Sequence, residues 1–139
     1  MILLDTSGLI SALFPDQRHH EACAVALLAS EPPLVVSPFV LAEIDYLITK
    51  YADVQAEIDF LKDVAAGAYI VASFGGSDVS QAVRIVERYR DLDVGLTDAS
   101  IVILAEQYGT TDVLTLDERH FRSLRTRDGQ PFRLLPADV

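Results

Sequence analysis

The sequence predicts an α/β fold in which a mostly parallel sheet is covered by helices on both faces. Short apolar runs with the length of buried strands recur along the chain, and Leu34-Val35-Val36 is one example. Between these runs lie longer segments with apolar residues at helical spacing. Strands without polar alternation are typical of parallel sheets, and the intervening helices supply the crossovers that parallel strands need. The alternation therefore indicates consecutive βαβ units.

In the first half of the chain, turn and capping residues delimit two strands and four helices. The segment Asp5-Thr6-Ser7 ends the first strand and opens a helix, which Pro15 stops. Ser37 is a good N-cap, and Pro38 suits the first position of the helix that follows. The expected strands are Ile2–Leu4 and Leu34–Val36, and the expected helices are Ser7–Phe14, Gln17–Ser30, Pro38–Lys50 and Ala52–Ala66, the last with Val54, Ile58, Leu61 and Val64 on its apolar face.

The second half continues the alternation to the end of the chain. Gly75-Gly76 breaks the chain before a helix capped by Ser77, and Thr97 is the expected N-cap of a helix from Asp98 to Tyr108. That helix is apolar on nearly all sides, so we expect it to be the most buried one, and Gly109 ends it. The other expected elements are strands at Tyr69–Val71 and Asp112–Leu116, a helix carrying Val79, Ala82, Val83, Val86 and Tyr89, a helical turn from Asp117 to Phe121, and an edge strand within Phe132–Pro136.

Composition indicates one compact domain spanning residues 1–139. Half of the 139 residues are hydrophobic and 23% are charged, which is typical of a globular chain. The single cysteine, Cys23, excludes an intrachain disulfide and fits a reducing compartment. The N-terminus lacks the features of a signal peptide, and the longest apolar run, Ile101–Ala105, is too short to cross a bilayer. We therefore expect a cytoplasmic protein without membrane contact.

The chain is strongly acidic. With 21 acidic and 11 basic residues, the net charge is −10, which repels a phosphate backbone. Three explanations are open: a solvated acidic surface, a site for divalent metals, or a basic partner.

Four acids are expected at one edge of the sheet. Asp5 follows the first strand and Asp117 follows the fourth, while Glu43 and Asp98 lie early in helices that follow strands or loops at this edge. In open parallel sheets, ligands bind outside the carboxyl ends of the strands. Two carboxylates about 4 Å apart repel by roughly 4 kcal/mol at an effective dielectric of about 20, so cations would stabilise the group. Carboxylate oxygens suit Mg²⁺ or Mn²⁺, although each acid taken alone could be an ordinary cap or surface residue.

Four motifs carry a resemblance to a known family. They are L-L-D-T-S-G-L-I at Leu3–Ile10, S-P-F-V-L-A-E-I at Ser37–Ile44, G-L-T-D-A-S-I-V at Gly95–Val102 and V-L-T-L-D-E-R-H-F at Val113–Phe121. In their order, spacing and total length they resemble the PIN domain, and within it the VapC-type toxins of bacterial type II toxin–antitoxin systems. The match spans nearly the whole chain.

The resemblance implies a PIN-like three-layer α/β/α sandwich and a Mg²⁺-dependent endoribonuclease, with Mn²⁺ as an alternative ion. Asp5, Glu43, Asp98 and Asp117 match the family's catalytic, metal-binding quartet. Thr6 matches a hydroxyl that helps to hold Asp5 or a metal-bound water. The resemblance further implies an RNA substrate, for the VapC branch transfer or ribosomal RNA, a cognate antitoxin protein and a homodimer. Metal-activated water would then cleave the phosphodiester.

Several other residues have competing interpretations. Asp93 is either an additional acid near the metal or, as we favour, a surface residue. His19 and Cys23 form half of a zinc pattern that nothing completes, and His120 could contact RNA, but the neighbouring Phe121 favours a packing role for this turn. Two arginine groups are candidate RNA contacts, with surface ion pairs or antitoxin acids as alternatives: Arg119, Arg122, Arg125, Arg127 and Arg133, and Arg84, Arg88 and Arg90.

Three other functions are alternatives to a toxin ribonuclease. A signalling receiver domain needs a lysine after a late strand, but the only lysines, Lys50 and Lys62, lie on helices of the first half. A catalytically silent PIN module that only binds RNA or protein is disfavoured because all four acids are present. A PIN nuclease acting on DNA or in RNA processing is the third alternative, and the absence of an added RNA-binding segment favours the toxin.

Overall fold

The computed structural model describes residues 1–139 and contains one five-stranded parallel sheet. The strand order is β3-β2-β1-β4-β5, and all four pairings are parallel. The strands are β1 Ile2–Leu4, β2 Leu34–Val36, β3 Ile70–Val71, β4 Asp112–Leu114 and β5 Arg133–Leu135. The predicted parallel sheet is therefore confirmed, and the expected edge strand of the tail is present. Because Leu4 pairs with Leu114, the residues that follow β1 and β4 emerge side by side.

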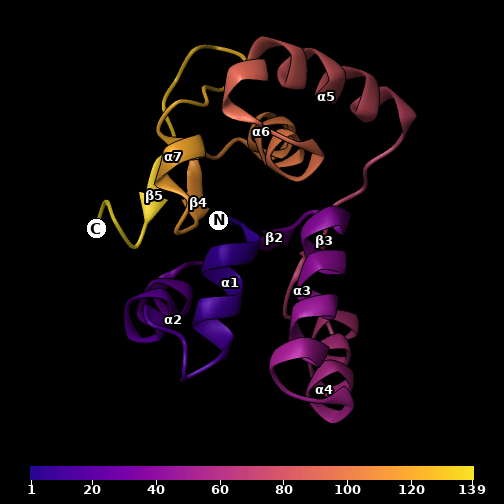
Figure 1. The fold of residues 1–139 in the computed structure, drawn as a ribbon, viewed down its shortest axis with the longest axis vertical. Helices are drawn as coiled ribbons and strands as arrows, with labels where there is room; N and C mark the ends of the chain where they lie inside the picture. The colour runs from indigo at the N-terminus through magenta and orange to yellow at the C-terminus, as the bar shows by residue number, and fades with distance from the viewer.

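Seven α-helices surround the sheet. They are α1 Thr6–Leu13, α2 His20–Ala29, α3 Pro38–Tyr51, α4 Val54–Ala65, α5 Gly76–Arg88, α6 Leu96–Tyr108 and α7 Glu118–Phe121, with the 3-10 turn η1 Arg90–Leu92 before α6. In Figure 1, α1 and α2 lie on one side of the strands, whereas α6 and α5 lie on the other. Helix α3 contacts both α1 and α6, which brings the two helical layers together at one end of the sheet.

The core fills the space between the sheet and these helices. The strands β1, β2 and β4 are almost completely buried, as their apolar sequences predict. Seven consecutive residues of α6, from Ala99 to Ala105, are buried, so the prediction that this helix is the most buried is confirmed. At the other end of the core, Phe121 packs edge-to-face on Phe132 with ring centroids 5.9 Å apart, which fixes α7.

Several helix starts differ from the predictions. Helix α6 begins at Leu96 after an extended Gly95, so Thr97 is not the N-cap and Asp98 is the third helical residue. Helix α5 begins at Gly76, so Ser77 is not its N-cap. The N-terminal end of the helix is stabilised by the Asp78 carboxylate, which accepts a hydrogen bond from the Gly75 N–H at 2.9 Å. In both cases an extended glycine is the N-cap residue, and the helix begins directly after it, before the hydroxyl residue expected to cap it.

Two further boundaries differ, whereas one cap is as expected. Helix α2 begins at His20, not at Gln17. Strand β4 ends at Leu114, not at Leu116, because the Leu116 N–H donates to the Ser7 hydroxyl and not to a neighbouring strand. The Ser37 cap of α3 is confirmed, since its Oγ accepts a hydrogen bond from the Val40 N–H at 3.2 Å.

The apolar faces predicted for α4 and α5 are largely not in the core. On α4 the buried residue is Phe60, while Val54, Ile58 and Leu61 are exposed. On α5 only Ala82 is buried, and Val79, Val83 and Val86 are exposed. These helices flank the sheet instead of being enclosed, so part of each apolar stripe has no partner within the chain. No helix combines the length and hydrophobicity needed to cross a bilayer.

Candidate active site

One cleft at the carboxyl end of the sheet is lined by the four acids of the expected metal-binding quartet. It has a volume of about 840 Å³. Its polar and charged lining consists of Asp5, Thr6, Ser7, Glu43, Tyr46, Thr97, Asp98 and Asp117. The acids come from the end of β1, from α3, from the first turn of α6 and from the loop after β4. A second hollow of about 900 Å³ at the amino end of the sheet, beside α2, contains none of them.

Asp5 is the buried acid of the cleft, only 5% exposed. Its Oδ2 accepts hydrogen bonds from Thr115 Oγ1 at 2.6 Å and from Ser7 Oγ at 3.2 Å. Burial raises the pKa of Asp5 to about 6 even though the Thr115 hydrogen bond opposes it, and the charge of Asp98 adds to the increase. The ionised form of Asp5 is therefore unfavourable unless a cation is present.

The close approach of α1 to β4 sets the position of Asp5. A Cβ on Gly8 would lie 2.4 Å from the Leu114 carbonyl oxygen, so only glycine lets the helix sit this close to the strand. Ser7 Oγ accepts a hydrogen bond from the Leu116 N–H at 2.9 Å across the same contact. The start of α1 is thus fixed directly against the end of β4.

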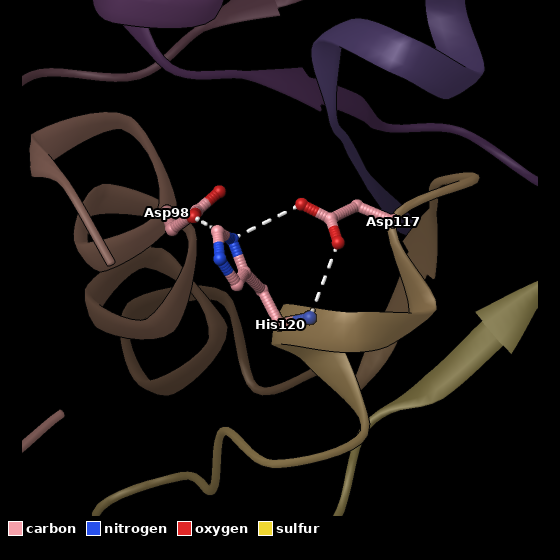
Figure 2. A group of neighbouring side chains, drawn as sticks. All are labelled: Asp98, Asp117 and His120. Carbon is pink, nitrogen blue, oxygen red and sulfur yellow. Dashed lines mark hydrogen bonds and ion pairs between the residues drawn. The ribbon is translucent and has the colours of Figure 1, made fainter. Parts of the chain in front are cut away.

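A second pair of acids meets around a histidine, as Figure 2 shows. His120 Nδ1 lies 2.8 Å from Asp98 Oδ2 and 3.1 Å from Asp117 Oδ2. Asp117 also caps α7, because its Oδ1 accepts a hydrogen bond from the His120 N–H at 3.1 Å. Burial raises the pKa of Asp98, the His120 ring opposes the increase, and the charges of Asp117 and Glu43 add to it. Asp117 therefore both caps α7 and lines the cleft.

Glu43 completes the acidic set from the opposite wall. It is exposed, and its Oε1 accepts a hydrogen bond from Thr6 Oγ1 at 2.6 Å. The family resemblance leads one to expect that Thr6 holds Asp5 or a water. In the structure the Thr6 hydroxyl donates to Glu43, while the hydroxyls of Thr115 and Ser7 donate to Asp5. The expected contact of Thr6 with a metal-bound water stays a prediction.

Comparison with known proteins accounts for this arrangement. The family model for the PIN domain matches residues 2–126. This chain belongs to the PIN-domain family. It is 40% identical over 135 residues to Ribonuclease VapC26 of Mycobacterium tuberculosis, an alignment that covers 97% of this chain and 100% of that protein. The structure is similar to the crystal structure of Mycobacterium tuberculosis VapC20, a sarcin–ricin-loop-cleaving toxin, with a TM-score of 0.76 and 17% identity over 84% of this chain and 90% of the other. The second likeness supports the PIN fold alone.

Within this PIN domain, sequence reasoning underrated three side chains that hold the acids. Ser7 and Thr115 bind Asp5, and His120 joins Asp98 to Asp117. The expectation that the turn at His120 mainly serves packing is thus incomplete: Phe121 does pack in the core, but the preceding ring faces the acids. The signal available in the sequence was position, since Thr115 and His120 flank Asp117 directly after β4.

Other residues of the PIN domain lie outside the cleft. Asp93, with a left-handed φ of 54°, is exposed and does not line it, which agrees with the favoured surface role. Cys23 is fully buried, His19 is exposed, and the residues grouped closely enough to hold a metal do not include them.

Most of the C-terminal arginines are engaged with the chain itself. Arg122 pairs with Glu118 and Asp138. Further ion pairs join Arg127 to Glu106 and Arg133 to Asp112, and Arg125 donates to backbone carbonyls. The ion-pair interpretation therefore holds for Arg122, Arg127 and Arg133. Arg119, on α7 between Asp117 and Phe121, has no such partner.

Proposed function

We propose that this chain is a divalent-metal-dependent endoribonuclease of the VapC type and the toxin of a toxin–antitoxin pair. The observation that carries the proposal is the meeting of Asp5, Glu43, Asp98 and Asp117 in one cleft, although they lie on four different segments of the chain. The name of the relative that is 40% identical, a ribonuclease, supports RNA as the substrate. Residues 1–139 would act as one catalytic domain.

The four acids fit a Mg²⁺ site, with Mn²⁺ as the alternative ion. Their oxygens are the donors that such hard ions take in proteins. The raised pKa values of Asp5 and Asp98 arise from burial and from mutual repulsion, and a bound cation would relieve both. When bound, the ion would supply a polarised water and neutralise charge on the phosphate. The positive ion also offsets the acidic character of the cleft toward RNA.

Three hydroxyl side chains beside the acids would position them. Thr115 and Ser7 orient Asp5, and Thr6 orients Glu43. Because all three hydroxyls are engaged with the acids, we propose water, not a protein side chain, as the attacking group. Arg119 is the arginine beside Asp117 that is free to contact the RNA backbone. Transfer or ribosomal RNA is the proposed target.

Two protein partners belong to the proposal. A cognate antitoxin with a basic segment would complement the net charge of −10 and the acidic cleft. A second copy of the chain would cover the valine stripe of α5, where Val79 is 41%, Val83 50% and Val86 37% exposed. Replacing Val83 with glutamate should convert a dimer to a monomer in light scattering, whereas a wild type that is itself monomeric at micromolar concentration would refute the dimer.

Induced expression followed by sequencing of new RNA 5′ ends tests the function. Wild type should arrest growth and produce a defined cut, and Asp98→Asn should do neither. Asp93→Asn is the matched control, since it removes an exposed acid outside the cleft, and it should behave like wild type. Cleavage by Asp98→Asn would refute the mechanism. RNA binding without cleavage by wild type would favour a silent module, and cleavage without growth arrest would favour a processing nuclease.

A further inference from the structure

His120 places a nitrogen donor beside two of the acids that line the cleft, Asp98 and Asp117. One ligand atom each from Asp98, Asp117 and His120 lies within 4.8 Å of the others. The ring is only 17% exposed, and Asp98 is 15% exposed, so these groups meet in a partly desolvated place and not on open surface. Figure 2 shows the ring between the two acids, with its Nδ1 side facing both of them.

We propose that His120 is a ligand of the metal centre through Nδ1 and that it gives this site a preference for Mn²⁺ over Mg²⁺. The proposal rests on the metal site of the proposed function and goes beyond it, because the acidic quartet alone is a set of oxygen donors. Nδ1 would ligate with the ring neutral and its proton on Nε2.

The two separations measured from the ring nitrogen fit adjacent positions around one ion. Neighbouring ligands of an octahedral ion with bonds of about 2.1 Å lie about 3 Å apart. The separations of Nδ1 from Asp98 Oδ2 and from Asp117 Oδ2 are 2.8 and 3.1 Å. Each donor could therefore bind the same ion with small adjustments of the side chains.

The local structure holds the ring in this place. Phe121, the next residue, is fully buried and packs on Phe132, so α7 is anchored in the core. The backbone N–H of His120 binds Asp117 Oδ1, which leaves Oδ2 of the same carboxylate facing the ring. The histidine and Asp117 are thus positioned by one helical turn as a unit.

A nitrogen ligand changes which ions the site prefers. Mg²⁺ is bound mainly through carboxylates and waters, whereas imidazole is a favourable ligand for first-row transition metals. Replacing one oxygen donor by Nδ1 should therefore strengthen Mn²⁺ binding relative to Mg²⁺. We expect the ratio of the two dissociation constants to change by roughly tenfold when the ring is removed, the lower end of the loss caused by deleting a metal-site partner.

The test measures Mn²⁺ and Mg²⁺ binding to the full chain by calorimetry for wild type, His120→Asn and Asp98→Asn. Asparagine places an amide near the position of Nδ1, so the two acids keep a polar neighbour while the imidazole is lost. Electron spin-echo spectroscopy of Mn²⁺ bound to wild type should detect coupling to a histidine nitrogen, and the coupling should be absent in His120→Asn. Melting curves in metal-free buffer establish that each variant is folded.

The outcomes separate this proposal from the proposed function. Loss of the Mn²⁺ preference in His120→Asn, with Mg²⁺ binding retained, supports the nitrogen ligand. An unchanged ratio of dissociation constants together with no nitrogen coupling in wild type would overturn it and leave His120 as a hydrogen-bond partner of the acids. Unchanged metal binding by Asp98→Asn would instead overturn the metal site on which the proposed function depends.

Discussion

Replacing Asp5 with asparagine should make the metal-free protein more stable at neutral pH, although it removes an acid from the centre of the site. The folded-state pKa of Asp5 is about 6, against an ordinary value of 3.8, because the carboxyl is buried. The folded protein therefore favours the protonated form. Stability contributed by that form is complete below about pH 4 and is lost as the pH rises through about 6.

The size of the effect follows from the difference between the two pKa values. A shift of about two units corresponds to roughly 3 kcal/mol at 1.36 kcal/mol per unit. Asparagine is neutral at every pH, and its carbonyl oxygen can accept the hydrogen bonds from Thr115 and Ser7 that Asp5 accepts. The variant should therefore exceed wild type by up to roughly 3 kcal/mol above pH 7, with the difference disappearing toward pH 4.

Urea unfolding with a chelator present, measured from pH 4 to pH 8, checks this result. Asp93→Asn is the matched control and should stay within about 0.5 kcal/mol of wild type, since its side chain is exposed. With the chelator removed, free Mn²⁺ at 100 times its dissociation constant should stabilise wild type by about 2.7 kcal/mol but not Asp5→Asn. If Asp5→Asn were less stable than wild type at pH 8 without metal, the explanation by burial of a charge would be refuted.

Two further substitutions test how the site is positioned. Gly8→Ala should destabilise the fold by about 1–3 kcal/mol in urea unfolding, because the new methyl group would lie 2.4 Å from the Leu114 carbonyl oxygen; an unchanged midpoint would mean that α1 moves away freely. Phe121→Ala should cost about 3–5 kcal/mol, since the ring is fully buried against Phe132. A loss below 1 kcal/mol would show that α7 is not anchored by this ring.

The sequence was sufficient for the order of the elements because each one is marked by residues with strong local preferences. Ser37 followed by Pro38 starts α3 as predicted, and Gly109 ends α6 in the left-handed conformation, with a φ of 68°. Where two neighbouring residues could both cap a helix, the predicted start of the helix was wrong. Thr97 could have capped α6, but Gly95 is the N-cap and the helix begins at Leu96.

The features that could not be predicted from the sequence depend on contacts between distant segments of the chain. The bond between Thr115 and Asp5 joins residues 110 positions apart, and only the pairing of β1 with β4 brings them together. The periodicity of α4 likewise contains two possible apolar faces, and burial of Phe60 left Val54 and Ile58 exposed. The spacing of apolar residues within one helix does not determine which face of the helix packs on the sheet.

The central place of β1 has a consequence for synthesis of the protein. During synthesis, β1 stays without one of its two neighbours until Leu114 has been made, because β4 follows it by more than a hundred residues. An incomplete chain carries Asp5 and Glu43 but has neither Thr115 to orient the first nor Asp117 to complete the group. If the chain is the toxin that we propose, products that end before Thr115 are harmless, and the hazard to the cell arises only after Asp117 has been translated.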